Sequence, residues 1–250
     1  MLRFQRYLRK RKNFGYFNIK TVFLGGSKLE HFDGKSDSVT INLNYQDKRY
    51  IYRGSKRIFD FVASLFGLTI LSPLFLIIAI AIKAEDPKGP VFYSQVRLGK
   101  KQSPFKMYKF RSMIVDADNH LKELLSENEV DGAMFKMKED PRVTKVGHFI
   151  RKYSIDELPQ LVNVLLGNMS LVGPRPPLPR EVAEYTEYDK QRLAVKPGCT
   201  GLWQISGRND VGFSEMVELD LSYINKRSIM LDLSILIKTV AVFIKPNGAY

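Results

Sequence analysis

The sequence predicts an α+β protein that is largely helical, with small β-hairpins, one re-entrant membrane helix broken at Ser72-Pro73, and interfacial amphipathic helices. Three observations predict this class: a long uncharged run interrupted by a proline, short alternating segments separated by turn residues, and several segments with helical periodicity. The 250 residues suffice for one sizeable core with a small appendage. We divide the chain into a basic N-terminal extension (1–52), a membrane helix (53–90) and a main domain (91–250) apposed to the cytosolic face of a membrane.

The positive charge is concentrated near the N-terminus. Residues 1–57 hold 14 Lys and Arg against 4 Asp and Glu, whereas the formal net charge of the whole chain is +13. Such a block suits lipid or nucleic-acid phosphates, and charge alone does not choose between them. Aromatic and basic residues do not interleave repeatedly, so we expect anionic membrane lipids as partners and no nucleic acid.

Residues 39–52 alternate apolar and polar positions, which predicts a short hairpin in the N-terminal extension. The one cysteine, Cys199, excludes internal disulfides and cysteine-rich zinc sites.

The most informative segment is Phe61–Ile82, a run of 22 residues without a charge. Pro73 lies near its middle, and a proline there leaves the carbonyl of Thr69 without its helical donor, so we expect a kink or a break. The expected arms, Ile58–Ser72 and Leu74–Lys83, are roughly 22 Å and 15 Å long at ~1.5 Å per residue. Neither arm alone crosses a hydrocarbon core of about 30 Å.

Both flanks of this run are basic, which favours a helix that enters the membrane, bends at Ser72-Pro73 and returns. Lys56 and Arg57 precede the run, and Asp60 is spaced for a helical ion pair with Arg57 at the interface. A proline-kinked spanning helix is the alternative, because membranes tolerate such kinks. A buried soluble helix is disfavoured by the length of the uncharged run.

The main domain begins with a predicted hairpin and continues with helices. We expect strands over Val91–Leu98 and Ser103–Phe110, and an extended or turning loop at Gly173–Pro179. Ile229–Ile244 is strongly apolar but contains Asp232 and Lys238, which suits a helix lying on a membrane. The other helices are expected at Val115–Asn128, Leu158–Leu166 and Glu181–Leu193.

The chemistry indicated is that of carboxylates and arginines. The sequence contains no GxGxxG, GxxxxGK[ST], HExxH or GxSxG motif, and its three histidines are too scattered for a metal site. The densest polar cluster runs from Arg151 to Pro159. Pro159 indicates a helix that starts just upstream of it, with either Asp156 or Ser154 as its cap. Both choices place Asp156 and Glu157 at the positive end of this helix. Taken alone, the two carboxylates fit a capping role best.

Three arginines in or near loops that contain glycine and proline change this interpretation. Arg175 lies in Gly173-Pro-Arg-Pro-Pro177, Arg208 ends Gly201-Leu-Trp-Gln-Ile-Ser-Gly-Arg208, and Arg151 precedes the carboxylates. Arginines in such loops are suited to gripping phosphate oxygens. Carboxylates with arginines fit phosphoryl transfer, in which a carboxylate can be the nucleophile and a neighbouring one can hold Mg²⁺.

Seven motifs together resemble one family, the bacterial sugar transferases, also called monotopic phosphoglycosyl transferases. The resemblance covers about Arg53 to Tyr250, and seven motifs in one order are far more specific than any one alone. They are Lys56-Arg57-x-x-Asp60, Ser72-Pro73, Tyr108-Lys-Phe-Arg-Ser-Met113, Asp140-Pro-Arg142, Ser154-x-Asp156-Glu-Leu-Pro-Gln160, Leu171-Val-Gly-Pro-Arg-Pro176 and Gly201-Leu-Trp-Gln-Ile-Ser-Gly-Arg208.

The resemblance implies a catalytic domain at 91–250 on the cytosolic face of the bacterial cytoplasmic membrane, held monotopically. It implies that Asp156 attacks the β-phosphate of a UDP-hexose, releases UMP and passes the hexose phosphate to undecaprenyl phosphate, as in the first step of exopolysaccharide, capsule or glycan assembly. It also implies Mg²⁺ at Glu157 and Asp156. The residues expected to contact phosphate or donor are Arg151, Arg175, Arg208, Pro174, Pro176, Lys109, Arg111 and, in a less defined role, Asp220.

Two rival functions remain. A glycosyltransferase of the DxD type, based on Asp116-Ala-Asp118, would release UDP in place of UMP. A non-enzymatic adaptor would rely on the basic block and would not depend on Asp156. The C-terminal Asn247-Gly-Ala-Tyr250 resembles glucose- and galactose-phosphate members of the family, whereas the sequence leaves open the hexose and any homo-oligomer.

Overall fold

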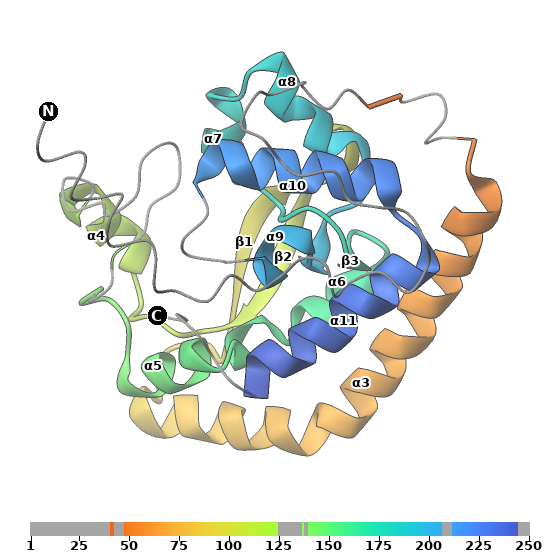
Figure 1. Cartoon of the computed structure of the whole chain (residues 1–250). Coiled ribbons are helices and arrows are strands. Elements are labelled where there is room, and N and C mark those ends of the chain that lie inside the picture. Colours follow the sequence, from red (N-terminus) through yellow and green to blue (C-terminus); the bar gives the residue numbers. More distant parts are fainter. Residues whose placement is uncertain (1–40, 43–47, 125–136, 138–139, 207–211, 245–250) are drawn as a thin grey trace, which may run out of the picture. The chain divides into compact units, whose positions relative to one another are not determined.

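The protein is described by a computed structural model covering residues 41–42, 48–124, 137, 140–206 and 212–244. All of them belong to one compact unit, Val39–Tyr250. The unit is largely helical, as predicted, and its described strands form two small two-stranded sheets (Figure 1). The elements in chain order are α3 (Tyr50–Glu85), β1 (Phe92–Leu98), β2 (Pro104–Phe110), α4 (Ala117–Leu124), α5 (Lys145–Lys152), α6 (Gln160–Leu166), β3 (Ser170–Val172), α7 (Pro179–Ala183), α8 (Glu187–Lys190), β4 (Gly198–Thr200), α9 (Leu202–Ile205), α10 (Phe213–Lys226) and α11 (Ile229–Ile244), with 3-10 turns η3 (Lys100–Gln102), η5 (Ile155–Glu157) and η6 (Gln191–Ala194).

The apolar run lies in α3, which is one continuous helix with Pro73 inside it. Of the two expected outcomes, a kink or a break, the structure therefore shows the kink: Figure 1 shows that α3 changes direction part-way along its length without being interrupted. The Ser72 hydroxyl donates a hydrogen bond to the carbonyl of Thr69 at 2.8 Å. This is the carbonyl that Pro73 leaves without a backbone donor, so the serine compensates for the lost bond and the helix continues as a bend.

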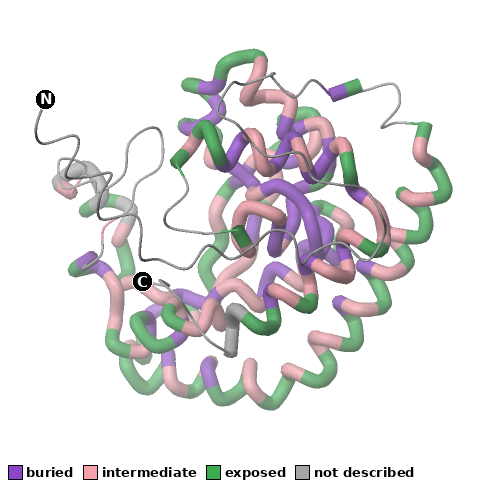
Figure 2. The backbone as a smooth tube through the Cα atoms, viewed as in Figure 1, coloured by how far each residue is buried: buried purple, intermediate pink, exposed green. Residues whose placement is uncertain are grey.

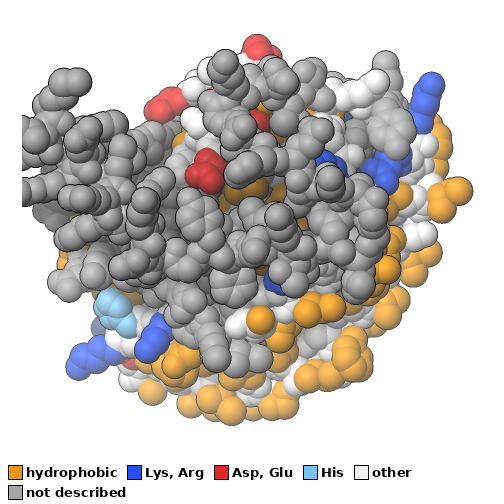
Figure 3. Space-filling model, in the orientation of Figure 1, with side chains coloured by type: hydrophobic (Ala, Val, Ile, Leu, Met, Phe, Trp, Pro, Cys, Tyr) orange, Lys and Arg blue, Asp and Glu red, His pale blue; other side chains and the backbone are white. Residues whose placement is uncertain are grey.

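The outer side of α3 is apolar and exposed. Among the described residues, α3 is the one helix long and apolar enough to cross a membrane, and only 11% of its most apolar window is buried. A core helix of a soluble protein would be mostly buried, so this face needs an apolar environment outside the unit. Figure 2 shows exposed positions repeating along α3, and Figure 3 shows hydrophobic side chains gathered over it. They include Ile58, Val62, Leu65, Phe66, Ile70, Leu76, Ile77 and Ile80.

The inner side of α3 is attached to the rest of the unit by polar contacts near its N-terminus. Asp60 is buried, accepts from the Ser170 hydroxyl at 2.7 Å and from the Leu171 amide at 3.2 Å, and so binds β3. Arg57 donates to the last carbonyls of α6 at 2.6 and 2.8 Å. The expected ion pair between Arg57 and Asp60 is therefore wrong, because each group has a partner from a distant part of the chain.

The C-terminal end of α3 is attached as well. The Glu85 carboxylate accepts hydrogen bonds from the amides of Lys145 and Val146 at 2.8 and 3.2 Å, which lie at the N-terminus of α5. A carboxylate at a helix N-terminus is favourable because free amides and the helix dipole both attract it. Directly after α3, Asp86 pairs with Arg111 at 2.5 Å. Both ends of the helix thus contact the same unit.

The predicted hairpin of the main domain is confirmed. β1 and β2 pair antiparallel with Ser94 opposite Tyr108, and η3 connects them. The second sheet is not a hairpin, because β3 and β4 are parallel and the segment between them contains α7, α8 and η6. The hairpin predicted over 39–52 is wrong for its last three residues, which form the first turn of α3; residues 39–40 and 43–47 lie outside the described part.

The predicted helices are confirmed to different degrees. The helices at Leu158–Leu166 and Ile229–Ile244 correspond to α6 and α11, and Gly167 ends α6 with a φ of 82°. For the helix expected at Val115–Asn128, the described part is α4, and residues 125–128 lie outside it. The helix expected at Glu181–Leu193 is wrong as one element. Thr186 and Asp189 form a capping box that begins α8, so the segment divides into α7, α8 and η6.

The core lies where α6, α10, α11 and the second sheet meet. Asp232 of α11 points inward and not toward a membrane: it accepts from Tyr52, Lys56 and Tyr223 at 2.8, 2.9 and 2.7 Å. This buried group binds α3, α10 and α11 to one another. The surrounding apolar side chains that are essentially inaccessible include Val164, Met169, Val172, Val217, Leu221, Ile224 and Ile235.

Candidate active site

The carboxylate pair lies on η5, between α5 and α6. Ser154 precedes it with a φ of 51°, a left-handed conformation that is uncommon for a residue with a side chain. This residue stops α5 and starts a separate turn, and α6 begins only at Gln160 with Pro159 as its N-cap. Both capping alternatives are therefore wrong: Asp156 does not cap α6, and the side chain of Ser154 makes no capping bond. Backbone strain of this kind is found preferentially at functional sites.

Asp156 and Glu157 share one cation, Lys109 of β2. The Lys109 ammonium lies 2.6 Å from Glu157 Oε1 and 3.7 Å from Asp156 Oδ2. The side chain of Asp156 is only 10% exposed, whereas that of Glu157 is 43% exposed. The pair therefore has one sheltered carboxylate and one that faces the outside, which suits two different roles.

The sheltered carboxylate has an altered acidity. Burial is the largest cause that raises the pKa of Asp156 to about 6, and the charge of Glu157 acts in the same direction. The positive charges of Lys109 and Arg151 oppose this rise. At neutral pH the group is therefore mostly ionised, yet it is poorly solvated. A desolvated carboxylate held beside cations is a suitable nucleophile for a phosphorus atom.

The position of Lys109 depends on Asn163 of α6. The Asn163 side-chain oxygen accepts from the Tyr108 amide at 2.9 Å, and its amide group donates to the Lys106 carbonyl at 2.7 Å. These two bonds fasten β2 to the helix that follows the carboxylates. Asn163 is fully buried, so its loss would leave backbone groups unpaired.

The structure brings together some of the predicted cations and separates others. Arg151, in the last turn of α5, acts electrostatically on Asp156. Arg111 instead forms its ion pair with Asp86 at the exit of α3, so its described contact is with the membrane-helix end and not with the carboxylate pair. Arg208 lies outside the described residues.

The loop after β3 contains the predicted Pro174, Arg175 and Pro176. Both prolines are buried and Arg175 is half-buried. The Arg175 guanidinium lies 3.6 Å from the carboxylate of Glu181, at the start of α7. A close approach of two backbones shapes this loop: a Cβ at Gly198 would lie 2.0 Å from the Gly173 nitrogen, so only glycine fits at position 198.

Asp220 is not exposed to solvent but forms a buried ion pair with Arg192. Both side chains are 1% exposed, and Arg192 also donates to the Tyr185 hydroxyl at 3.0 Å. Burial raises the pKa of Asp220 to about 6, against the opposing effect of Arg192. The structure therefore places Asp220 beneath the Arg175 loop, as a support for Arg192, whose Nη2 lies 3.5 Å from the Arg175 carbonyl.

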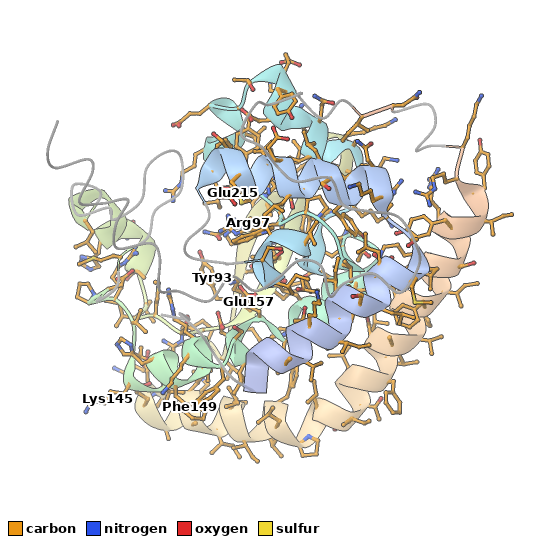
Figure 4. The ribbon with its side chains drawn as sticks, viewed as in Figure 1. Tyr93, Arg97, Lys145, Phe149, Glu157 and Glu215 are labelled. Carbon is orange, nitrogen blue, oxygen red and sulfur yellow. The ribbon has the colours of Figure 1, made fainter. Side chains whose placement is uncertain are left out.

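Sequence reasoning missed two arginines near this loop, Arg97 and Arg192. Arg97 is the one buried residue of β1, while its apolar neighbour Val96 is 47% exposed. A single charge among the apolar and aromatic residues of a strand was the available signal. Arg192 carried no comparable signal, because it follows a polar stretch. Figure 4 shows Tyr93 and Arg97 on β1 together with Glu157, and Arg97 interacts electrostatically with each of the other two.

Asp156 and Glu157 are the described residues that would hold Mg²⁺ together with substrate phosphates. Within the described residues, no group of three or more His, Cys, Asp or Glu side chains could hold a metal. Mg²⁺ is commonly held by one or two carboxylates together with substrate phosphates, and Asp156 and Glu157 supply two. The ammonium of Lys109 beside both carboxylates shows that the pair attracts positive charge.

The rival DxD motif lies elsewhere. Asp116 is exposed, with a φ of 67°, and directly precedes α4, in which Asp118 lies.

Comparison with known proteins agrees with the resemblance. Residues 51–246 match the family model described as bacterial sugar transferase. The chain is 44% identical over 227 residues to the galactosyl transferase CpsE of Streptococcus agalactiae serotype III, covering 90% of this chain and 49% of that protein. It is 45% identical over 213 residues to the undecaprenyl-phosphate galactose phosphotransferase of Salmonella typhimurium, covering 84% and 44%.

A third relative is of similar length to this chain. The exopolysaccharide production protein ExoY of Sinorhizobium fredii is 42% identical over 200 residues, covering 78% of this chain and 88% of that protein. The chain thus spans about half the length of the first two relatives and most of the third. Given the family model and these identities, the chain belongs to the bacterial sugar transferase family.

Proposed function

We propose that the protein transfers a hexose 1-phosphate from a UDP-hexose to undecaprenyl phosphate, with release of UMP, through a covalent intermediate on Asp156. The observation that carries the proposal is a buried carboxylate beside one ammonium and one more exposed carboxylate. The name of the Salmonella relative supports the same class of reaction.

The first step forms and breaks one bond at phosphorus. An oxygen of the Asp156 carboxylate attacks the β-phosphorus of the donor, and the bond from this phosphorus to the bridging oxygen breaks. UMP leaves with the electron pair of that bond, and the hexose phosphate stays on Asp156 as an acyl phosphate. Lys109 and Arg151 hold positive charge beside Asp156, and Arg175 would bind donor phosphate oxygens.

The second step regenerates the free carboxylate of Asp156. An oxygen of undecaprenyl phosphate attacks the same phosphorus, and the bond from the phosphorus to the Asp156 oxygen breaks. The products are undecaprenyl diphosphate hexose and the free carboxylate, so no other reactant is needed. Mg²⁺, held by Glu157 and Asp156 with donor phosphate, would neutralise the charge that develops on the phosphate oxygens.

We also propose that α3 is re-entrant and that the enzyme lies on the cytosolic face of the bacterial cytoplasmic membrane. Lys56 pairs with Asp232 near one end of α3, and Glu85 binds the start of α5 at the other end. A helix crossing a hydrocarbon core of about 30 Å would put these two contacts on opposite sides of the membrane. Since both contacts are with one folded unit, a bent helix that returns is favoured.

Cysteine labelling tests the re-entrant helix. Lys48→Cys and Lys88→Cys place thiols at exposed positions before and after α3 in a Cys199→Ala background. A membrane-impermeant maleimide added to intact cells should label neither, and should label both after the cells are opened. Labelling of one position in intact cells would favour a spanning helix.

The released nucleotide tests the reaction. Purified protein with Mg²⁺ and undecaprenyl phosphate is given a panel of UDP-sugars, and the nucleotides are separated by chromatography. UMP is expected from UDP-galactose or UDP-glucose, which also identifies the hexose. UDP in place of UMP would support the DxD glycosyltransferase, and no nucleotide release would favour the adaptor. The name of ExoY, an exopolysaccharide production protein, supports a product that enters exopolysaccharide assembly, which we propose for this chain as well.

A further inference from the structure

The loop segment Pro174–Pro177 is held through its carbonyl groups. Each of the four consecutive carbonyls accepts a hydrogen bond, and the donors come from three elements: β4, η6 and β1. Three of the four residues are prolines, which have no N–H to donate, so the carbonyls are the groups by which this backbone can be fixed. The four bonds run from Gly198 N to Pro174 O (2.9 Å), Arg192 Nη2 to Arg175 O (3.5 Å), Arg97 Nη1 to Pro176 O (3.0 Å) and Leu98 N to Pro177 O (3.0 Å).

Two of these donors are buried guanidinium groups. Arg97 is 6% exposed and Arg192 is 2% exposed. Burying a charge is unfavourable unless it is paired and hydrogen-bonded, so a buried arginine that binds a loop carbonyl needs a reason to be there. For Arg192 the charge is balanced by Asp220, as described above. For Arg97 the carbonyl-type oxygen of Gln95 accepts two bonds, at 3.1 and 2.7 Å, and supplies no negative charge.

The charge of Arg97 is affected by both burial and neighbouring charges. Burial and the nearby positive charge of Arg175 together lower the pKa of Arg97 to about 10. Two guanidinium groups that repel each other define a place where an anion is favourable. Glu181 and Glu157 interact with Arg97 in the opposite sense, so the arginine remains charged.

The side chain of Arg175 is oriented by Glu181, which also binds the backbone at the end of the loop. Its guanidinium lies 3.6 Å from Glu181 Oε1, while Glu181 Oε2 accepts from the Leu178 amide at 2.8 Å. Glu181 is itself buried, so it fixes the end of the loop as well as the guanidinium. Buried groups thus fix the backbone of Pro174–Pro177, the residue that follows it, Leu178, and the side chain of Arg175.

We infer that Arg97 and Arg192 are positioning residues, which hold the backbone of Pro174–Pro177 so that the Arg175 guanidinium meets the diphosphate of the donor. The inference rests on the proposed function, and it assigns these two arginines an action through Arg175 and not through direct contact with the substrate. Asp220 acts one step further back, by keeping Arg192 charged and oriented.

A double-mutant cycle on UMP release tests this. Arg97→Met removes one bond to the loop without breaking an ion pair, and Arg192→Met combined with Asp220→Asn removes the other without leaving a buried carboxylate unpaired. Each is measured alone and together with Arg175→Ala, with thermal unfolding to confirm that every variant folds. Arg180→Met, an exposed arginine on α7, is the matched control.

Each loop variant alone should lower kcat/KM by roughly 10-fold to 100-fold, because a misplaced binding group costs about that much. The loss should appear in the same parameter, kcat or KM, as the loss caused by Arg175→Ala. In the Arg175→Ala background, the further loss should be less than about 2-fold, because residues acting through one group are not additive. The control should keep full activity.

Two results would overturn the inference while leaving the proposed function intact: losses that multiply fully in the Arg175→Ala background, or loop variants as active as the wild type. A different result would remove the proposed function and the inference with it. That result is a wild-type protein that folds but releases no UMP from any UDP-sugar.

Discussion

The η5 turn and the Pro174–Pro177 loop contrast in how they are held. The carboxylates of η5 lie on a short turn entered through a left-handed serine, and the charges of Lys109 and Arg151 act on Asp156. The loop has no residue with a positive φ, and all four of its carbonyls accept hydrogen bonds from β1, β4 or η6. The difference suggests a division of labour: the turn keeps a nucleophile poorly solvated and reactive, whereas the loop keeps a phosphate-binding group in a fixed place.

The largest effect should come from the turn. Asp156→Asn keeps the shape of the side chain but removes the nucleophile, so UMP release should fall by at least about 10⁴-fold. The control Glu187→Gln neutralises an exposed carboxylate on α8 and should leave the rate unchanged. UMP release by the Asp156→Asn protein at a normal rate would show that Asp156 is not the nucleophile. The proposed difference in role between the turn and the loop would then be wrong.

The loop should respond differently, through stability as well as rate. In Gly198→Ala the new methyl group would lie 2.0 Å from the Gly173 nitrogen and 2.5 Å from the Thr200 carbonyl oxygen, both backbone atoms. The two segments must separate, and the free energy of unfolding should fall by about 1–3 kcal/mol, as measured by urea denaturation.

Gly54 of α3 provides the control for this substitution. Apart from its chain neighbours and the nearby backbone of α3 itself, no described atom lies within 4 Å of the position that a Cβ would take there. Gly54→Ala should therefore raise stability by up to about 1 kcal/mol, the ordinary helix preference for alanine. Equal effects at the two glycines would show that the backbone at Gly198 is not closely packed against that at Gly173.

The contact between α3 and the core should give an effect on stability comparable to that of Gly198→Ala. Asp232→Asn removes the charge that pairs with Lys56 inside the unit, and breaking a buried pair costs on the order of 3 kcal/mol. The loss should be visible in urea denaturation of the protein in detergent. If stability is unchanged, the charge of Asp232 does not contribute to the attachment of α3.

The smallest effects concern the acidity of the turn. In the metal-free protein, the Asp156 carboxyl should titrate near pH 6, followed by the chemical shift of its labelled carboxyl carbon. Lys109→Met removes a charge that favours the ionised form and should raise this pKa, whereas Glu157→Gln removes a repelling charge and should lower it. Because the ionised form is the nucleophile, the reactive fraction falls as the pH drops below about 6. Shifts in the same direction for both variants would contradict the electrostatic description.

The sequence predicted what depends on local pattern. The hairpin of β1 and β2, the helix α11 and the end of α6 at Gly167 follow from alternation, periodicity and a glycine stop. The capping box of Thr186 was also readable, and attention to it would have divided the predicted helix over Glu181–Leu193. The grouping of Asp156, Glu157 and Lys109 followed from the family motifs.

What the sequence did not predict depends on contacts between distant residues. Asp60 is bonded to β3, more than a hundred positions away, so a helical pair with Arg57 could not be excluded from spacing alone. Arg97 is buried because a loop carbonyl from another segment needs a donor, and Arg111 points to Asp86 because α3 ends there. The left-handed Ser154 likewise reflects the tertiary junction of α5 with η5 and not its own preference.

The most direct test of the account is to trap the intermediate. The protein is incubated with the UDP-hexose that it uses and with Mg²⁺, without undecaprenyl phosphate, then quenched, digested and analysed by mass spectrometry alongside the released nucleotide. The account predicts one hexose phosphate on the peptide that contains Asp156, with an equal amount of UMP, and loss of the adduct when undecaprenyl phosphate is added before quenching. UMP release with the adduct on another residue, or turnover with no adduct at all, would contradict it.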